Sequence, residues 1–541
     1  MDHVNQQPVR IQNPILPGFH PDPSVVRVGD TYYLAVSTFQ WFPGVAVYQS
    51  RDLAHWSFAA FPLTRESQLP LRGVPDSCGI FAPCLSWDGG TFYLVYTVVK
   101  TDSVWQDTDN YLVTAPEITG PWSEPVYLNS AGFDPSLFHD ADGRKWLVNR
   151  DCDTRGYLQD RGGILLREYD PAARRLTGPE YRIYRSTKII GAEGPHLYRK
   201  DGWYYLLLAE GGTDWNHVAT LARSESLFGP YTCAPNTPFL TSRDAPELPL
   251  QKAGHGCLVE TPDGRWYLTH LVGRPLPGTR RCVLGRETAL QEVRWTEDGW
   301  LELAHGGHWP AVEVAVPAVE AESVPRSCLD HFDRTELGYP YQTLRVPLPE
   351  TVLSLTQRPG WLRLYGRDSL HSLDQQSLVA RRQQAFSYDA ETKMEYHPGN
   401  YHQMAGLICL YDTSNFYYLY VTRDEGGRRR LNLLVSLGHV LSWPLEDGVA
   451  LETEDALVLH AQVRRDRLQF FWRPEAENEL RPIGPVLDYS VLSDDWYMER
   501  GSYRFTGAFV GLCCQDCGDR TSWADFDYFL YEEQEEHYDG C

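Results

Sequence analysis

Three carboxylic acids and one imidazole occupy corresponding points of a strand pattern that the sequence repeats. Asp22, Asp134 and Glu193 each stand at the start of a short apolar run, and His255 stands at the start of another. Like charges crowded into one pocket resist ionising together, so at least one of these carboxyls should hold its proton. A protonated carboxyl beside an ionised one is the pair that glycoside hydrolysis uses as general acid and general base.

The Asp-Pro dipeptides also have a purely structural interpretation. Asp22-Pro23 and Asp134-Pro135 can be Asx-turns that begin strands and do nothing more. For any one of the acidic residues taken alone, that interpretation is the simpler one. Because all three fall at the same point of the repeat, the pattern favours a functional cluster.

The repeated unit is a β-hairpin with room for two further strands. Each copy has a short apolar strand, a turn that carries glycine, and a second, aromatic strand; the copies begin 60, 52, 60 and 61 residues apart. Asp-Gly turns supply the positive φ angles of a tight hairpin. Four-stranded units repeated around an axis predict a five-bladed β-propeller. The first strand of each blade lines the central channel, so the residues that start those strands should converge.

The pattern stops after Trp309. Residues 310–326 are rich in Pro, Ala, Val and Glu and predict a linker. Beyond them, alternating polar and apolar residues, for example at 388–396, predict strands with almost no helical periodicity. We therefore expect an all-β protein with a propeller at 1–309, a linker at 310–326 and a β-sandwich at 327–541.

Composition excludes several classes of partner. The chain has 541 residues and a formal net charge of −23, which disfavours binding to nucleic acid or to an anionic membrane surface. The N-terminal residues lack the features of a signal peptide, and no apolar run is long enough to span a membrane. The twelve cysteines fit reduced thiols of a cytoplasmic protein, and the Cys514/Cys517 pair lacks a second pair for zinc.

Several ordered motifs resemble glycoside hydrolase family 43, and its two-domain β-xylosidases most closely. The resemblance covers nearly the whole chain. It rests on residues 13–24 (NPILPGFHPDPS), 37–44 (STFQWFPG), 131–136 (AGFDPS), 193–196 (EGPH), 254–255 (GH), 273–275 (GRP), 284–288 (LGRET) and 505–509 (FTGAF).

The resemblance implies a five-bladed propeller followed by a β-sandwich, and it assigns roles to the carboxyls. Asp22 would be the base that activates water, and Glu193 the acid that protonates the leaving oxygen. Asp134 would orient the acid and keep its pKa high through like charge.

The same resemblance implies a sugar pocket. Phe39 and Phe81 would line the sugar subsite, Arg286 would donate hydrogen bonds to sugar hydroxyls, and His255 would lie beneath the sugar. Phe505 would reach over from the sandwich to close the pocket. No cofactor would be required, although the resemblance leaves room for a Ca²⁺ ion in the channel near His255.

Two departures from the family pattern concern the pocket. Residues 81–84 read Phe-Ala-Pro-Cys where relatives carry Trp-Ala-Pro-Asp, which shrinks one wall. Residues 150–153 read Arg-Asp-Cys-Asp where relatives carry an aromatic pair, which puts charge on the leaving-group side.

The sequence thus predicts an exo-acting, inverting glycosidase that releases xylose from the non-reducing end of β-1,4-xylo-oligosaccharides. An α-L-arabinofuranosidase, or an enzyme with both activities, is an alternative, and an inactive glycan-binding propeller is an alternative of another class. The expected partner is a small carbohydrate, with neither nucleic acid nor membrane. The sequence leaves the oligomeric state, including a homo-oligomer, open.

Overall fold

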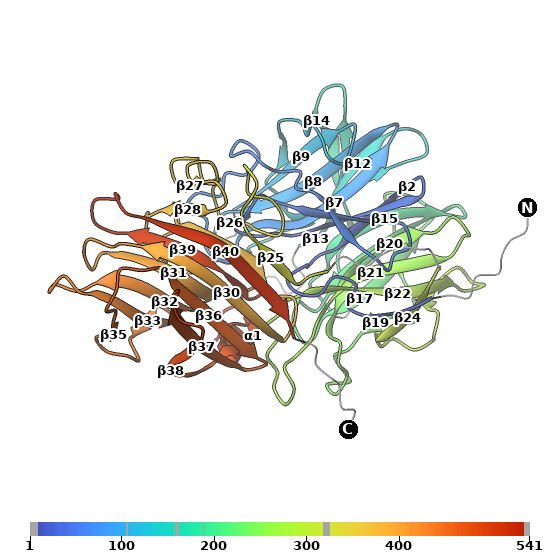
Figure 1. The fold of residues 1–541 in the computed structure, drawn as a ribbon. Helices are drawn as coiled ribbons and strands as arrows, with labels where there is room; N and C mark the ends of the chain where they lie inside the picture. Colours follow the sequence, from blue (N-terminus) through green and yellow to red (C-terminus); the bar gives the residue numbers. More distant parts are fainter. Residues whose placement is uncertain are drawn as a thin grey trace, which may run out of the picture. The chain divides into compact units, whose positions relative to one another are not determined.

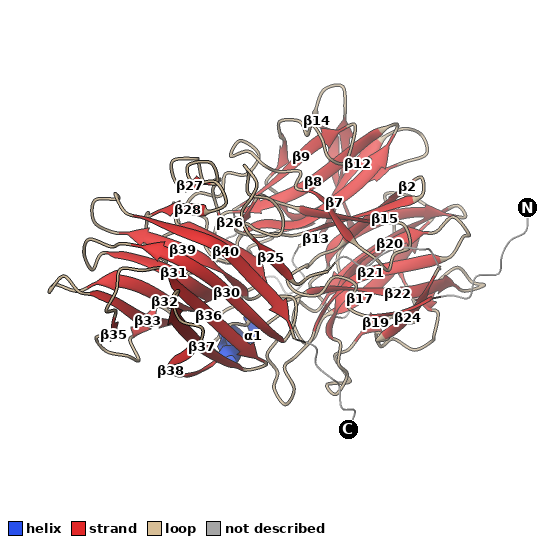
Figure 2. Ribbon diagram, in the orientation of Figure 1, coloured by secondary structure: helices blue, strands red, loops and turns tan. Residues whose placement is uncertain are grey.

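The computed structural model describes residues 9–103, 107–155, 157, 162–187, 189–317 and 325–534. Regular secondary structure in these residues is almost entirely strand, joined by loops, with one short helix and one 3₁₀ turn, as Figure 2 shows. The chain divides into two compact units, residues 1–274 with 286–324, and residues 275–285 with 325–541. In the described ranges, no helix has the length and hydropathy that crossing a membrane requires.

The first unit contains five antiparallel sheets, each built from consecutive strands (Figure 1). In the sequence, the short strand β4 (Trp41–Phe42) comes between the second and third strands of the first sheet, but it does not belong to that sheet. The sheets are β2 (Ser24–Val28), β3 (Thr31–Val36), β5 (Ala46–Ser50), β6 (Ser57–Ala60); β7 (Gly79–Asp88), β8 (Thr91–Val99), β9 (Thr108–Ala115), β10 (Val126–Asn129); β11 (Gly132–His139), β12 (Lys145–Asp151), β13 (Gly163–Asp170), β14 (Arg175–Tyr184); β15 (Glu193–Lys200), β16 (Trp203–Glu210), β17 (Val218–Ser224), β18 (Thr232–Cys233), β19 (Leu240–Thr241); and β20 (Gln251–Glu260), β21 (Trp266–Gly273), β22 (Glu287–Trp295), β23 (Leu301–Leu303).

The first strand of each sheet lies next to the first strand of the following sheet, and β20 packs back against β2. The sheets therefore form a closed ring of five blades around these inner strands, which confirms the predicted propeller. The segment that precedes the first blade is hydrogen-bonded to the last blade and to the chain that follows it. Asn13 donates from Nδ2 to the carbonyl oxygens of Leu290 and Ala311 at 2.8 and 2.9 Å, and Leu16 bridges Thr288.

Part of the predicted linker is ordered as a strand. Within residues 310–326, β24 (Glu313–Val316) pairs antiparallel with β1 (Val9–Gln12). Val314 and Val316 are buried while Glu313 is exposed, because the strand lays one face on the propeller core. The sequence composition suggested a linker, but a pairing across some three hundred residues is invisible in local composition.

The second unit is a sandwich of two antiparallel sheets, as predicted. Their inner faces share one apolar core. One sheet contains β25 (Cys328–Asp330), β27 (Leu353–Ser354), β28 (Leu362–Tyr365), β30 (Ser387–Tyr396), β36 (Leu457–Arg464), β37 (Arg467–Pro474), β38 (Arg481–Asp488) and β40 (Trp523–Glu533). The other contains β29 (Ser377–Arg382), β31 (Gln403–Leu410), β32 (Phe416–Arg423), β33 (Arg429–Leu437), β34 (Val440–Ser442), β35 (Val449–Ala450) and β39 (Phe509–Asp516). The remaining elements are the short strand β26 (Thr343–Leu344), the 3₁₀ turn η1 (Tyr489–Val491) and the helix α1 (Asp494–Met498).

The segment Pro275–Gly285 belongs to the second unit although it lies between two propeller strands in the chain. Arg281 forms an ion pair with Glu499 at 2.7 Å, and the Cys282 amide donates to the Asp495 carboxylate at 2.8 Å. Val283 is completely buried in the sandwich core. The predicted propeller at 1–309 is therefore interrupted by residues that fold with the sandwich.

Candidate active site

Five residues at equivalent points of the repeat, one just before β2 and one inside each of β7, β11, β15 and β20, share one unusual backbone conformation. Asp22, Ala82, Asp134, Gly194 and His255 have φ angles of 56°, 24°, 53°, 56° and 41°. The strand register shifts at this point in the last four blades, as it does at a β-bulge. Such a bulge re-aims the side chains around it.

Glu193 does not occupy the repeat position that the sequence assigned to it. The residue that corresponds to Asp22 and Asp134 is Gly194, and Glu193 precedes it by one. A Cβ atom on Gly194 would lie only 2.9 Å from Nε2 of His255. The acid is therefore carried by the preceding residue, because the repeat position itself has no room for a side chain.

Asp22 lies in the more deeply buried part of the cluster and has two strong donors. Arg286 donates from Nη1 to its Oδ1 at 2.8 Å, and the Ser37 hydroxyl donates to its Oδ2 at 2.6 Å. Nδ1 of His255 lies 3.7 Å from Oδ1. Burial on its own raises the pKa of Asp22, but Arg286, His255 and the Ser37 hydrogen bond outweigh it and the pKa is lowered. Asp22 is therefore an ionised carboxylate, as a general base must be.

Arg286 contacts both Asp22 and the aromatic ring of Phe39. Its guanidinium also donates to the Thr213 hydroxyl at 3.0 Å and lies 5.3 Å from the centre of the Phe39 ring. Its side chain is 4% exposed. The structure thus gives Arg286 a role in holding Asp22, while its predicted hydrogen bond to sugar hydroxyls stays a prediction.

Glu193 also has an arginine partner, on the neighbouring blade. Arg150 of β12 donates from Nη1 to Oε2 of Glu193. The same guanidinium lies 4.7 Å from the centre of the Phe133 ring, which faces Arg150 across the β11/β12 pair. The two side chains of this ion pair are 30% and 14% exposed, so this part of the cluster is more open than the base.

The surroundings of Asp134 favour its protonated form. Its Oδ2 accepts a hydrogen bond from the Gly194 amide at 3.0 Å. Burial raises its pKa well above the usual value, and the charges of Glu193 and Asp22 raise it further. Arg150 and the Gly194 amide oppose this shift without cancelling it. The cluster thus combines a carboxyl with a lowered pKa, Asp22, and a carboxyl with a raised pKa, Asp134, which accepts from the backbone amide next to Glu193.

Four phenylalanines form a continuous row that connects the two arginine-bound carboxyls. Their ring centres are separated by 5.7 Å from Phe19 to Phe39, 4.8 Å from Phe39 to Phe81 and 6.2 Å from Phe81 to Phe133. Apolar rings of this kind pack well against the faces of sugar rings. Phe39 and Phe81 therefore lie together beside the carboxyls.

Three buried histidines surround the inner part of the cluster. Burial lowers the pKa of His196 and of His217 to about 3, and it also lowers that of His255. Neutral imidazole nitrogens do not match the six to eight oxygen ligands that Ca²⁺ takes. Among the described residues, no group of three potential ligands could hold a metal ion. The Ca²⁺ ion that the resemblance leaves room for near His255 stays a prediction.

Phe505 lies in the second unit and is half-buried there. Its neighbour Thr506 is buried, and the Thr506 amide donates to the Tyr411 hydroxyl at 3.1 Å. Its role in closing the sugar pocket stays a prediction from the resemblance.

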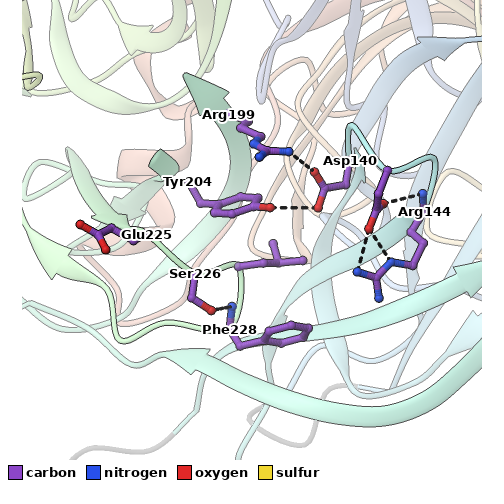
Figure 3. A pocket seen from close by; sticks show the side chains of 9 residues that line it. Asp140, Arg144, Arg199, Tyr204, Glu225, Ser226 and Phe228 are labelled. Atoms are coloured by element: carbon purple, nitrogen blue, oxygen red, sulfur yellow. Dashed lines mark hydrogen bonds and ion pairs between the residues drawn. The ribbon is translucent and has the colours of Figure 1, made fainter. Parts of the chain in front are cut away.

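A separate pocket lies between the third and fourth blades (Figure 3). Asp140 accepts hydrogen bonds from Arg199 at 3.2 Å and from the Tyr204 hydroxyl at 3.1 Å. Arg144 pairs with Asp142 at 2.8 Å. These charges neutralise one another, and the three active-site carboxyls are not among the residues that line this pocket.

Sequence reasoning missed the partners that set the chemistry of the carboxyls. Ser37 begins the motif at residues 37–44, but nothing in the sequence links it to Asp22. Arg150 was noted only as a charge on the leaving-group side, and its pairing with Glu193 was not predicted. Thr213 carried no sequence signal.

Comparison with known families places both parts of the chain. Residues 11–301 match "Glycosyl hydrolases family 43", and residues 329–532 match "Beta xylosidase C-terminal Concanavalin A-like domain".

Individual relatives match over nearly their full length. The chain is 49% identical to "Xylosidase/arabinosidase 43B" of Humicola insolens, over 96% of this chain and 97% of that protein. It is 44% identical to "Beta-xylosidase" of Bacillus subtilis (strain 168), over 97% of this chain and 100% of that protein. A crystal structure of xylan beta-1,4-xylosidase from Bacillus halodurans C-125 superimposes with a TM-score of 0.94 at 52% identity, covering 97% and 100% of the two chains.

Proposed function

The chain belongs to glycosyl hydrolases family 43, and we propose that it releases xylose from the non-reducing end of β-1,4-xylo-oligosaccharides. The resemblance seen in the sequence is confirmed, and the protein is an inverting glycoside hydrolase. The substrate is proposed on two grounds: the printed names of the relatives, and the geometry of the cluster.

One observation carries the proposal: burial changes steadily along the site. Asp22 and Arg286 are 6% and 4% exposed in their side chains, whereas Glu193 and Arg150 are 14% and 30% exposed. A sugar that packs on Phe39 and Phe81 therefore has a closed side at the base and an open side at the acid. Such a site accepts a chain end, with the leaving group directed outward.

The mechanism combines the contacts of each carboxyl with the roles that the family resemblance assigns. Asp22, ionised and held by Arg286 and Ser37, removes a proton from the water that attacks the anomeric carbon. Glu193 donates a proton to the glycosidic oxygen on the opposite face as the bond breaks. Asp134, whose pKa is raised and which accepts from the amide next to Glu193, orients the acid.

The test of the proposal is the anomeric configuration of the first product. Proton NMR at early times should show α-xylose appearing from a β-xyloside before mutarotation mixes the anomers. Early β-xylose would mean retention, and Asp22 would then be a nucleophile. Inversion requires the two carboxyls to stand roughly 6.5–9.5 Å apart, so that a water molecule fits between them and the sugar.

The second candidate activity is that of an α-L-arabinofuranosidase, alone or together with xylosidase activity. It is favoured by the name of the Humicola relative, which includes both activities. Rates on p-nitrophenyl β-D-xyloside and p-nitrophenyl α-L-arabinofuranoside separate the two. A ratio of kcat/KM above about tenfold for the xyloside supports xylosidase as the main activity.

We also propose that the enzyme acts in the cytoplasm on imported oligosaccharides. The described cysteines are all free thiols, which suits a reducing compartment. Cell fractionation with activity assays tests this location. Turnover should need no metal ion, so dialysis against EDTA should leave kcat unchanged.

A further inference from the structure

We propose that Arg150 binds the leaving group, by donating hydrogen bonds to hydroxyls of the second sugar of the substrate. This assignment rests on the proposed function. It extends that function from the xylose at the non-reducing end, whose anomeric carbon is attacked, to the second sugar, which is the leaving group.

The argument begins with what Glu193 must touch. A general acid lies within about 2.6–3.2 Å of the oxygen that it protonates. That oxygen is O4 of the leaving xylose, so the leaving sugar ring lies against Glu193. Arg150 donates to the same Glu193 carboxyl, and therefore its guanidinium lies within reach of that ring.

Arg150 also has donors to spare. A guanidinium carries five N–H groups in one plane, and it accepts no hydrogen bond. Arg150 uses one of them on Glu193, and the others meet no acceptor among the described residues. The O3 hydroxyl next to O4 of a xylose ring, with O2 beyond it, is an acceptor of the required kind.

Two features fix the guanidinium in place and keep it accessible. Its position 4.7 Å from the centre of the Phe133 ring restricts its rotation, so the free donors are oriented before substrate binds. Its side chain is 30% exposed, whereas that of Arg286, bound to the base, is 4% exposed. Of the two arginines that hold these carboxyls, only Arg150 faces the open side of the site.

The experiment compares two substrates that both need the acid and differ only in whether a sugar leaves. Xylobiose releases xylose, and methyl β-D-xyloside releases methanol; both leaving oxygens need protonation. With Arg150→Met, kcat/KM for xylobiose should fall about 10- to 100-fold, the loss of hydrogen bonds from a charged donor. With methyl β-D-xyloside the loss should be about tenfold smaller than with xylobiose, because this substrate is affected only through the lost contact between Arg150 and Glu193. Equal losses on both would show that Arg150 acts through Glu193, and no loss on either would remove it from the site; each result overturns the assignment.

Arg199→Met is the matched control. Arg199 lies on β15, the strand that begins with Glu193, where it pairs with the Asp140 carboxylate (Figure 3). It also lies 5.3 Å from the centre of the Tyr204 ring. Like Arg150→Met, this variant removes an arginine that pairs with a carboxylate and lies over an aromatic ring, but it does so outside the cluster of Asp22, Asp134 and Glu193. It should therefore leave kcat/KM for both substrates unchanged.

A second variant and a second measurement guard against a loss of folding. Arg150→Lys keeps a charge for Glu193 but loses the planar fork, so it should retain methyl β-D-xyloside activity and lose part of the xylobiose activity. In an inactive Asp22→Asn background, calorimetry should show weaker xylobiose binding when Arg150 is replaced, with methyl β-D-xyloside binding unchanged. Unchanged xylobiose binding contradicts the assignment. A wild-type protein that cleaves neither xyloside would contradict the proposed function itself, and this assignment would fall with it.

Discussion

The surroundings of the proposed base, Asp22, and of the proposed acid, Glu193, are similar in their contacts and differ in exposure. At each end a carboxyl accepts from an arginine that also covers a phenylalanine: Asp22 from Arg286 beside Phe39, and Glu193 from Arg150 beside Phe133. The base pair is almost fully buried, whereas the acid pair is open to solvent.

This difference matches the two chemical tasks. The base must stay ionised and keep one orientation, and a buried ion pair with a second donor from Ser37 achieves both. The acid must lose and regain a proton in every cycle and let the leaving group depart, which a sealed site would prevent. The predictions below test this comparison from the largest expected effect to the smallest.

Asp22→Asn should have the largest effect. The fold and sugar binding should survive, because an amide fits the same space and still accepts from Arg286. Without a base, kcat should fall by about 10³–10⁴-fold on xylobiose and on an aryl xyloside alike. Steady-state kinetics on both substrates measure this, and a variant that keeps a tenth of the wild-type kcat would exclude Asp22 as the base.

Glu193→Gln should instead separate the two substrates. Hydrolysis of xylobiose needs protonation of the leaving oxygen, so its kcat should fall by about 10²–10⁴-fold. An activated aryl leaving group departs without that proton, so p-nitrophenyl β-xyloside should lose much less. Equal losses on both substrates would contradict the role of Glu193 as general acid.

Arg286→Met should cost both stability and activity. Removing one partner of a buried ion pair leaves an uncompensated charge, at a cost of about 3–5 kcal/mol in the free energy of unfolding. Without the charge of Arg286, which does most to lower the pKa of Asp22, burial raises that pKa. The acid limb of the kcat/KM profile should therefore move to higher pH.

The pH dependence of the Arg286→Met defect has a defined sign. In the wild type the pKa of Asp22 is lowered in the folded state, so its contribution to stability is present above the unfolded pKa and is lost as pH falls through the folded pKa. In the variant, the buried charge disappears once Asp22 is protonated. The difference in Tm from the wild type should therefore be larger near pH 7 than near pH 4. A difference that does not depend on pH would contradict the ion pair as its cause.

Gly194→Ala should destabilise the protein less than Arg286→Met does. The residue has a φ of 56°, and a Cβ would lie 2.9 Å from Nε2 of His255. Left-handed strain costs about 1–2 kcal/mol, and the displaced His255 should weaken substrate binding. Thermal unfolding and KM measure the two consequences. Gly202→Ala is the control, since Gly202 has a φ of 86° and nothing within 4 Å of the Cβ position, so it isolates the backbone strain. If both variants behave alike, contact with His255 does not matter.

The sequence by itself determined the blade count and the sandwich, and it predicted the roles of the three carboxyls. Those features repeat locally: each blade has its own hairpin signal, and each carboxyl stands beside a strand start. The family match and the fold confirm the architecture. Local pattern also misled, because it placed Glu193 at the repeat position that Gly194 occupies and read β24 as linker.

Only the tertiary structure decided which partner each carboxyl has. Arg286 stands 264 residues from Asp22 in the chain, and Arg150 stands 43 residues from Glu193 on another blade. Closure of the ring brings these groups together, and the left-handed residue at each strand start turns the side chains inward. The charge state of a buried carboxyl depends on its neighbours in space and on its distance from water. Neither is a property of the residues beside it in the chain. The sequence therefore predicted which carboxyls lie in the site, and the fold determined the direction in which the pKa values of Asp22 and Asp134 are shifted.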